Sequence, residues 1–203
     1  MKIAIIGTGN VGGTLATRWA EAAHQIYLGV QDLKDEQAQR LLDNPHTSLH
    51  LTAEAVAQAA VILVATPPQI APQLVEDFGE IDGKIIIDAT NAIQAKPAPY
   101  PTAFHAFEAL TKAEVVKCFN TTGFENMRDP QYGDLAIDMF MAGDSKRAKE
   151  VATQLAQDIG FANCYDFGTS EQVVLLEQLA LSWINLALVQ GQGRGIAFKV
   201  LRR

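Results

Sequence analysis

Six residues near the start of the chain, Gly7-Thr8-Gly9-Asn10-Val11-Gly12, have the spacing of a loop that holds the pyrophosphate of a dinucleotide. They follow the apolar run Ile3–Ile6 directly and open a helix-like stretch, which is the strand–turn–helix context that such a loop requires. We expect Gly7 to allow the tight turn, Gly9 to let the backbone approach the phosphates, and Gly12 to let the helix pack on the strand. The amino terminus of that helix attracts phosphate charge. All six residues are therefore candidate cofactor-binding residues.

Further loops are expected beside this one, because the carboxyl ends of parallel strands meet at one edge of a sheet. Gln31 and Lys34 follow the second predicted strand, where dinucleotide-binding proteins contact the adenosine ribose. Asp32 lies between them, and we favour its capping the next helix over its binding the ribose hydroxyls. An acid here is typical of NAD sites and a cation of NADP sites, so the residues leave both cofactors open. The remaining candidate cofactor-binding residues follow the fourth and fifth predicted strands: Ala65, Thr66, Pro67 and Asn91.

Candidate residues for the partner of the cofactor lie further along the chain. Asn120 and Thr121 end an apolar strand beside the expected crevice. Two interpretations of Asn120 stay open: it contacts a nicotinamide ring or an acceptor, or it is a turn residue that bonds its own backbone. Asp88 ends a strand of three isoleucines, and we interpret it as structural, bonded to a neighbouring loop.

Eight short apolar runs predict strands, and several are apolar on consecutive residues, as in strands covered on both faces. They are Ile3–Ile6, Gln25–Gly29, Ser48–Leu51, Val61–Ala65, Lys84–Asp88, Val115–Phe119, Ile137–Ala142 and Asn163–Phe167. Helices are predicted between them, over Asn10–Ala22, Lys34–Leu42, Ala53–Ala60, Pro68–Phe78, Ala103–Leu110 and Ser145–Ile159. This alternation predicts an α/β fold with a doubly wound, mostly parallel Rossmann sheet of about eight strands in residues 1–167.

From Gly168 onward the pattern is helical, and residues 168–203 are expected to form a small C-terminal helical appendage. A helix from Ser170 to about Gln190 carries apolar groups around most of its circumference. We expect it to pack across a two-fold homodimer interface and to line the acceptor pocket through Trp183. The alternative is a helix wholly enclosed between the sheet and the tail Ile196–Leu201. Polar residues within the helix argue against a membrane span.

Composition and charge exclude several other classes of protein. Hydrophobic residues make up 48% of the 203 and charged residues 19%, which excludes a disordered chain. The net charge of −7 disfavours a nucleic-acid partner. The four histidines are scattered and no GxSxG motif occurs, so we expect neither a metal site nor acyl transfer. The two cysteines lack CxxC spacing and no signal-peptide pattern is present, which predicts reduced thiols and a cytoplasmic location.

The chain resembles the NADP oxidoreductases named for the deazaflavin-coenzyme reductase of archaea, whose Rossmann domain is similar to the reductase domain of the six-transmembrane metalloreductases. The resemblance rests on Ile5-Ile6-Gly7-Thr8-Gly9-Asn10-Val11-Gly12, Asp88-Ala89-Thr90-Asn91, Lys117-Cys118-Phe119-Asn120-Thr121, Met141-Ala142-Gly143-Asp144 and Gly193-Arg194-Gly195-Ile196-Ala197-Phe198-Lys199. It implies an enzyme that binds NADPH and passes hydride to a flavin-like acceptor. Members of the family typically have Gly-Ser-Arg after the second strand, where this chain has Gly29-Val30-Gln31.

We therefore predict an oxidoreductase that transfers hydride between a nicotinamide cofactor, NADP or NAD, and a deazaflavin, flavin or similar small-molecule acceptor. No catalytic acid or base is assigned, because hydride transfer between two stacked rings depends on their positioning more than on a proton donor. Two alternatives stay open: a pyrroline-carboxylate or imine reductase-like enzyme, and a non-enzymatic dinucleotide sensor. The C-terminal segment is short for the long helical dimerisation domain of imine reductases.

Overall fold

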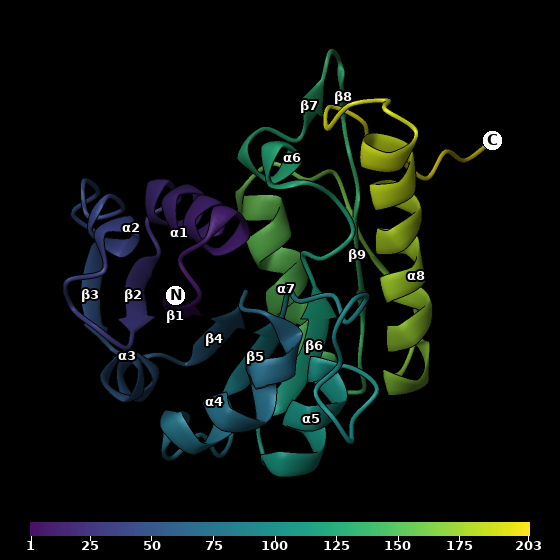
Figure 1. The fold of residues 1–203 in the computed structure, drawn as a ribbon. Coiled ribbons are helices and arrows are strands. Elements are labelled where there is room, and N and C mark those ends of the chain that lie inside the picture. The colour runs from purple at the N-terminus through teal and green to yellow at the C-terminus, as the bar shows by residue number, and fades with distance from the viewer.

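The computed structural model describes residues 1–203 and is built around an eight-stranded sheet (Figure 1). Its strands are β1 (Lys2–Ile6), β2 (Gln25–Val30), β3 (Thr47–Leu51), β4 (Val61–Val64), β5 (Ile85–Asp88), β6 (Glu114–Cys118), β9 (Met139–Ala142) and β10 (Cys164–Asp166). Their order across the sheet is β10-β9-β6-β5-β4-β1-β2-β3. Neighbouring strands are parallel except for β6 and β9, which are antiparallel. Because the chain winds outward from β1 in both directions, the predicted doubly wound Rossmann fold is confirmed.

Helices cover both faces of the sheet, because each strand points its side chains alternately to the two sides. Ile3 and Ile5 of β1 point into one apolar core, and Ala4 and Ile6 point into the other. The helices over the first core are α1 (Asn10–Glu21), α2 (Glu36–Gln39) and α7 (Lys146–Asp158). Those over the second are α3 (Thr52–Gln58), α4 (Ala71–Phe78, after a 3-10 turn at Pro68–Ile70), α5 (Ala103–Leu110) and α8 (Val173–Ile184).

The C-terminal helix packs one side on the sheet, next to β9, and leaves its other side exposed (Figure 1). A 3-10 turn (Ser170–Gln172) leads into α8, and a π-helical turn (Asn185–Val189) ends it. Val173 and Leu176 are buried in the second core, whereas Leu175 and Val189 are 58% and 71% exposed. The alternative of a wholly enclosed helix is therefore wrong. By length and composition alone, the segment Ser170–Val189 is apolar enough to cross a membrane, with a mean hydropathy of 1.5.

The predicted strands and helices are all present, with shifts of a few residues at their ends. The helix expected over Lys34–Leu42 is the shorter α2, which begins at Glu36 because the Asp35 carboxylate caps it by accepting a hydrogen bond from the Ala38 amide at 2.9 Å. The expectation that Asp32 is the cap is wrong, since its Oδ1 accepts from the Lys34 amide within the preceding loop. Three very short elements were not predicted: α6 (Phe124–Arg128), β7 (Gln131–Tyr132) and β8 (Leu135–Ala136).

Candidate functional site

The Gly7–Gly12 loop connects β1 to α1, in the strand–turn–helix arrangement that its spacing predicts. Gly7 has a φ of +98°, and a Cβ on it would lie 2.6 Å from the Ala65 oxygen. A Cβ on Gly12 would lie 1.8 Å from the Gly7 oxygen. Around a Cβ on Gly9, by contrast, there is no atom within 4 Å. Gly7 and Gly12 therefore serve the fold, whereas Gly9 leaves open space at the amino terminus of α1, where phosphate groups bind.

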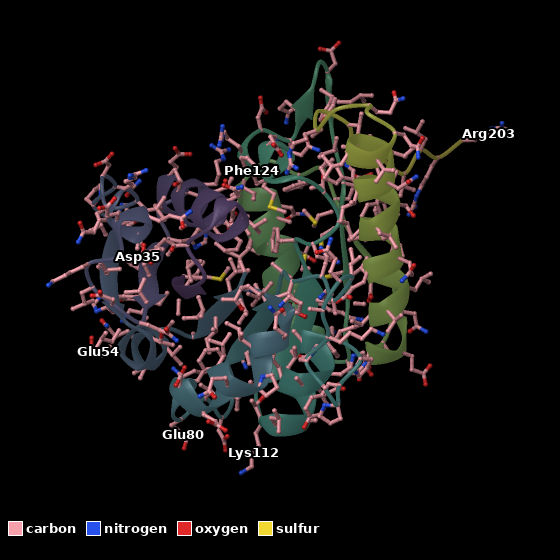
Figure 2. All side chains as sticks on the ribbon, in the orientation of Figure 1. Asp35, Glu54, Glu80, Lys112, Phe124 and Arg203 are labelled. Carbon is pink, nitrogen blue, oxygen red and sulfur yellow. The ribbon has the colours of Figure 1, made fainter.

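A cavity of about 450 Å³ opens beside this loop. Thr8, Gly9 and Asn10 line it, together with residues from α1, α2 and α6. Arg40 and Arg128 also line it, and no sequence signal marked them, because they lie at the ends of short helices that carry no motif. The Arg128 guanidinium lies 5.5 Å from the centre of the Phe124 ring, which also lines the cavity and is labelled in Figure 2. Cations beside a glycine loop suit an anionic ligand.

The residues predicted for the adenosine side lie in the loop after β2. Since β2 ends at Val30, Gln31 is the first residue beyond the strand, and both Gln31 and Lys34 are exposed. This loop therefore presents the Gln31 amide, the Asp32 carboxylate and the Lys34 cation to solvent near the sheet edge. Two other predicted cofactor-binding residues, Val11 and Ala65, pack against the first core and support the loops from below.

A second cavity, of about 380 Å³, lies at the ends of β4 and β5. Pro67 and Asn91, two of the predicted cofactor-binding residues, line it, and Ile184 reaches it from the end of α8. The structure corrects the placement of Trp183, whose indole is 4% exposed and donates a hydrogen bond to the Ile196 oxygen at 2.6 Å. Trp183 is thus enclosed beneath the C-terminal tail, and its neighbour Ile184 is the residue of α8 that lines the cavity.

Asn91 and Asn120 join the loops after β5 and β6 through reciprocal hydrogen bonds. Asn91 Nδ2 donates to the Asn120 backbone oxygen at 2.9 Å, and Asn120 Nδ2 donates to Asn91 Oδ1 at 3.0 Å. Asn120 therefore bonds the neighbouring loop and not its own backbone. The structure also corrects Thr121, which is buried and donates its hydroxyl to Met139 Sδ at 3.7 Å. Its side chain points into the core and is not available to an acceptor.

Three buried polar atoms at this edge of the sheet have no hydrogen-bond partner in the chain: Thr66 Oγ1, Thr90 Oγ1 and Asn120 Oδ1. They follow β4, β5 and β6, which are adjacent strands. A buried polar atom without a partner costs about 1–3 kcal/mol, and native proteins contain few of them. Three such atoms beside one crevice fit a ligand with a polar edge, such as the carboxamide of a nicotinamide ring. Together with the open space at Gly9, they fit a dinucleotide at both of its ends.

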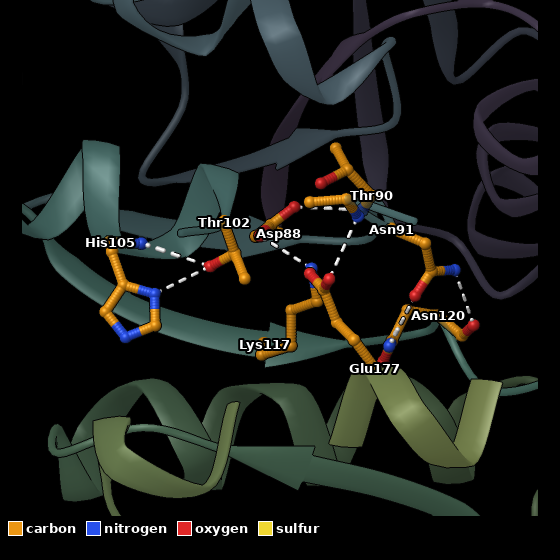
Figure 3. Close-up of polar contacts among 9 residues, drawn as sticks. Asp88, Thr90, Asn91, Thr102, His105, Lys117, Asn120 and Glu177 are labelled. Atoms are coloured by element: carbon orange, nitrogen blue, oxygen red, sulfur yellow. Dashed lines mark hydrogen bonds and ion pairs between the residues drawn. The ribbon is translucent and has the colours of Figure 1, made fainter. Parts of the chain in front are cut away.

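A buried ion network lies on the α8 side of the sheet (Figure 3). Lys117 Nζ is 2.9 Å from Asp88 Oδ2 and 2.5 Å from Glu177 Oε1, and both the Lys117 and Asp88 side chains are fully buried. The register pairs Asp88 with Lys117, so neighbouring strands point both side chains to the same face. Asp88 is structural, as predicted, but it bonds the Lys117 side chain and the Thr90 amide of the loop after its own strand, and not a neighbouring loop. Lys117 and Glu177 were missed. A bond between a strand and a helix 60 residues later leaves no spacing signal in the sequence.

Ionisable side chains line the 450 Å³ cavity, through Arg18, Glu21, Arg40 and Arg128, but not the 380 Å³ cavity. The side chains that line the 380 Å³ cavity are apolar or amide-bearing, and none of them titrates. Burial lowers the pKa of His105, whose Nδ1 is 2.7 Å from Thr102 Oγ1, near the ion network (Figure 3). Burial also raises the pKa of the Cys118 thiol, which lies 3.8 Å from the free thiol of Cys164. The structure contains no group of three His, Cys, Asp or Glu side chains placed to hold a metal ion.

Comparisons with known proteins find similarity to one family of NADP oxidoreductases. The family model for NADP oxidoreductases dependent on coenzyme F420 matches residues 2–92. An F420-dependent NADP reductase of Methanothermobacter marburgensis is 28% identical over 92% of this chain and 92% of its own. A crystal structure of a candidate F420-dependent NADP reductase from Arthrobacter sp. FB24 is 26% identical, with a TM-score of 0.87 over the full length of both chains.

A more distant structural likeness concerns the fold alone. A reductive aminase from Aspergillus terreus superposes with a TM-score of 0.71 at 18% identity. The alignment covers 94% of this chain but 62% of the aminase. The remainder of the aminase therefore has no counterpart in the 203 residues described.

Proposed function

Because its nucleotide-binding half belongs to the family of NADP oxidoreductases dependent on coenzyme F420, we propose that this protein transfers hydride between NADP(H) and a deazaflavin, flavin or similar acceptor. One observation carries the proposal. The open space at Gly9 and the unpartnered atoms of Thr66, Thr90 and Asn120 lie along the carboxyl edge of one parallel sheet. That edge is where doubly wound proteins bind dinucleotides.

Each part of the crevice has a distinct task in this proposal. The Thr8–Asn10 backbone and the amino terminus of α1 hold the pyrophosphate, because backbone N–H groups there point outward and attract negative charge. Gln31 and Lys34 contact the adenosine ribose and its phosphate. Asn91 and Asn120 orient the nicotinamide carboxamide. A bound NADPH would supply the hydride, and the protein would supply its orientation toward the acceptor.

The lining of the 380 Å³ cavity favours this reaction over the alternatives that require a protein acid. Its side chains include Pro67, Asn91, Ile93 and Ile184, and none donates or accepts a proton near neutral pH. Hydride transfer between two flat rings needs close stacking more than proton transfer from a side chain. An apolar cavity with a few amides meets that need, because it binds the face of a ring and excludes water.

The test has two stages that separate binding from turnover. NADPH and NADH are first titrated into the protein by calorimetry, and the oxidation of NADPH is then followed with coenzyme F420, FMN, a quinone and a cyclic imine. We expect binding of NADPH and turnover with the deazaflavin or the flavin. Turnover with the imine alone would replace the proposed acceptor, and binding without any turnover would indicate a dinucleotide sensor.

We also propose that the protein is a two-fold homodimer formed through α8. Apolar side chains are exposed along one side of this helix and of the π-helical turn that ends it: Leu175 by 58%, Leu186 by 39% and Val189 by 71%. A row of exposed apolar side chains on one helix indicates a binding surface, and a second copy offers the same surface in return. Light scattering at micromolar concentration should give twice the chain mass of 22.0 kDa. Leu175→Glu should give the monomer mass, and Leu110→Glu, at an exposed position on α5, should not.

A further inference from the structure

Glu177 of α8 holds the loop after β5 by two routes. Its Oε2 accepts a hydrogen bond directly from the Ala92 amide at 2.9 Å. Its Oε1 accepts from Lys117 Nζ, which also donates to Asp88 Oδ2. The other oxygen of Asp88 accepts from the Thr90 amide at 2.9 Å. The backbone amides on either side of Asn91 are thus both bonded to carboxylates of one buried network (Figure 3).

Asn91 is the residue through which this network reaches the crevice. Its side chain lines the 380 Å³ cavity and forms the reciprocal pair with Asn120. With both flanking amides bonded, the backbone of Asn91 has a defined position and its amide group a defined direction. A carboxylate 85 residues after Ala92 therefore contributes to the geometry of the nicotinamide end.

Stability alone does not explain a charged network in this place. Lys117 and Asp88 are fully buried and Glu177 is 6% exposed, so all three groups lose their hydration on folding. Apolar side chains of similar volume often make a protein as stable as a buried ion network does, or more stable. The charged groups instead fix the positions of the groups that they bond, since a carboxylate with two oxygens bonds two fixed donors at once.

We propose that Glu177 is a positioning residue for the nicotinamide half of the dinucleotide, acting through the amides of Ala92 and Thr90 on Asn91. This inference rests on the proposed function, and it goes further by assigning α8 a role in cofactor geometry. The network bonds none of the residues of the glycine loop. Loss of Glu177 should therefore affect the nicotinamide end and spare the phosphate end.

The test compares two ligands by calorimetry: NADPH, and 2′-phospho-ADP-ribose, which lacks the nicotinamide ring. In Glu177→Gln we expect NADPH to bind about tenfold more weakly, while the affinity for 2′-phospho-ADP-ribose stays unchanged. Asn91→Ala should show the same selective loss. Because Glu177 acts through Asn91, the double variant should bind NADPH no more weakly than Asn91→Ala alone. The matched control is Glu171→Gln, at an exposed position just before α8, which should bind both ligands normally.

A second variant covers the case in which Glu177→Gln does not fold. Glu177→Asp keeps the charge beside Lys117 but shortens the reach to the Ala92 amide, and it should show the same selective loss. Equal weakening of both ligands, an unchanged affinity for NADPH, or additive losses in the double variant would each overturn the inference. If the wild-type protein bound 2′-phospho-ADP-ribose but not NADPH, the inference about Glu177 would fail, whereas the assignment of the phosphate-binding site would still be supported. If it bound neither ligand, the proposed function would fail as well.

Discussion

Among the three glycines of the Gly7–Gly12 loop, substitution of Gly9 should affect binding, whereas substitution of Gly7 or Gly12 should affect stability. Gly9 is an extended N-cap residue with a φ of −66°, which any residue adopts, and no atom lies within 4 Å of an added Cβ. Gly9→Val should therefore fold normally. Its side chain would occupy the space in which a pyrophosphate approaches the backbone, so dinucleotide binding should be lost. Substitution of Gly7 or Gly12 should instead destabilise the fold, because an added Cβ would clash with backbone oxygens. Any loss of binding should follow from that destabilisation.

The size of each effect follows from the contacts. Gly9→Val should change the free energy of unfolding by less than about 1 kcal/mol, as substitutions without new contacts do. In Gly12→Ala the new methyl would lie 1.8 Å from the Gly7 oxygen, so β1 and α1 must move apart. Such overpacking costs about 3 kcal/mol, or roughly 6–12 °C in Tm for a domain of this size. For binding, Gly9→Val should raise the Kd for NADPH at least about 100-fold, equivalent to about 2.7 kcal/mol.

Thermal unfolding followed by circular dichroism measures the first effect, and calorimetric titration with NADPH measures the second. Gly9→Ala, with a smaller side chain at the same place, should give an intermediate Kd and an unchanged Tm. Gly195→Ala is the matched glycine control outside both cavities, since Gly195 also has open space around its Cβ and does not have a positive φ. A Gly9→Val protein with the wild-type Kd would refute the assignment of this loop, and one that unfolds would refute the packing argument.

Three other substitutions test the ion network, a carboxylate pKa and the cofactor preference. Lys117→Met should cost about 3–5 kcal/mol in urea unfolding, because it leaves two buried carboxylates unpaired, whereas Lys112→Met, at an exposed ion pair, should cost less than about 1 kcal/mol. Hydrogen bonds from Ser145 and Arg147 lower the pKa of Glu114, so its contribution to stability is present above the ordinary carboxyl pKa and is lost as the pH falls through the lowered value. Glu114→Gln should therefore lose stability at pH 7 but little at pH 3, and an equal loss at both would contradict this reasoning. Gln31→Arg should raise the preference for NADPH over NADH by up to roughly tenfold, through a bidentate bond to the 2′-phosphate, and an unchanged ratio of the two Kd values would show that the ribose lies elsewhere.

The sheet and the loops at its carboxyl edge could be predicted because their signals are local. Each strand is a short apolar run, as in Ile85–Asp88, and each helix between strands has its own end signals. Gly7, Gly9 and Gly12 lie within six consecutive residues, and two local features match their expected roles: Gly7 has a positive φ, and a Cβ on Gly12 would meet the Gly7 oxygen. From strand order alone it then follows that Thr66, Asn91 and Asn120 share one edge.

What the sequence could not determine depends on how elements far apart in the chain pack together. Alternation along a strand predicts which face a side chain takes, but not which helix covers that face. Asp88 and Lys117 point toward α8, and only the packed helix brings Glu177 within bonding distance of Lys117. The same holds for Arg128, which lies at the end of a helix too short to show a period.

Trp183 and Ile184 show most directly what could not be predicted from the sequence. Both lie on an apolar helix whose composition gives no reason to choose between them, and their directions differ by about 100° around its axis. The angle at which α8 packs on the sheet places Trp183 beneath the tail, bonded to Ile196, and places Ile184 at the cavity. The sequence determined that an apolar helix would lie beside the crevice, because burial of its inner side is favourable at any rotation. Tertiary packing determined which side chain lines the cavity, because each rotation of the helix presents a different one.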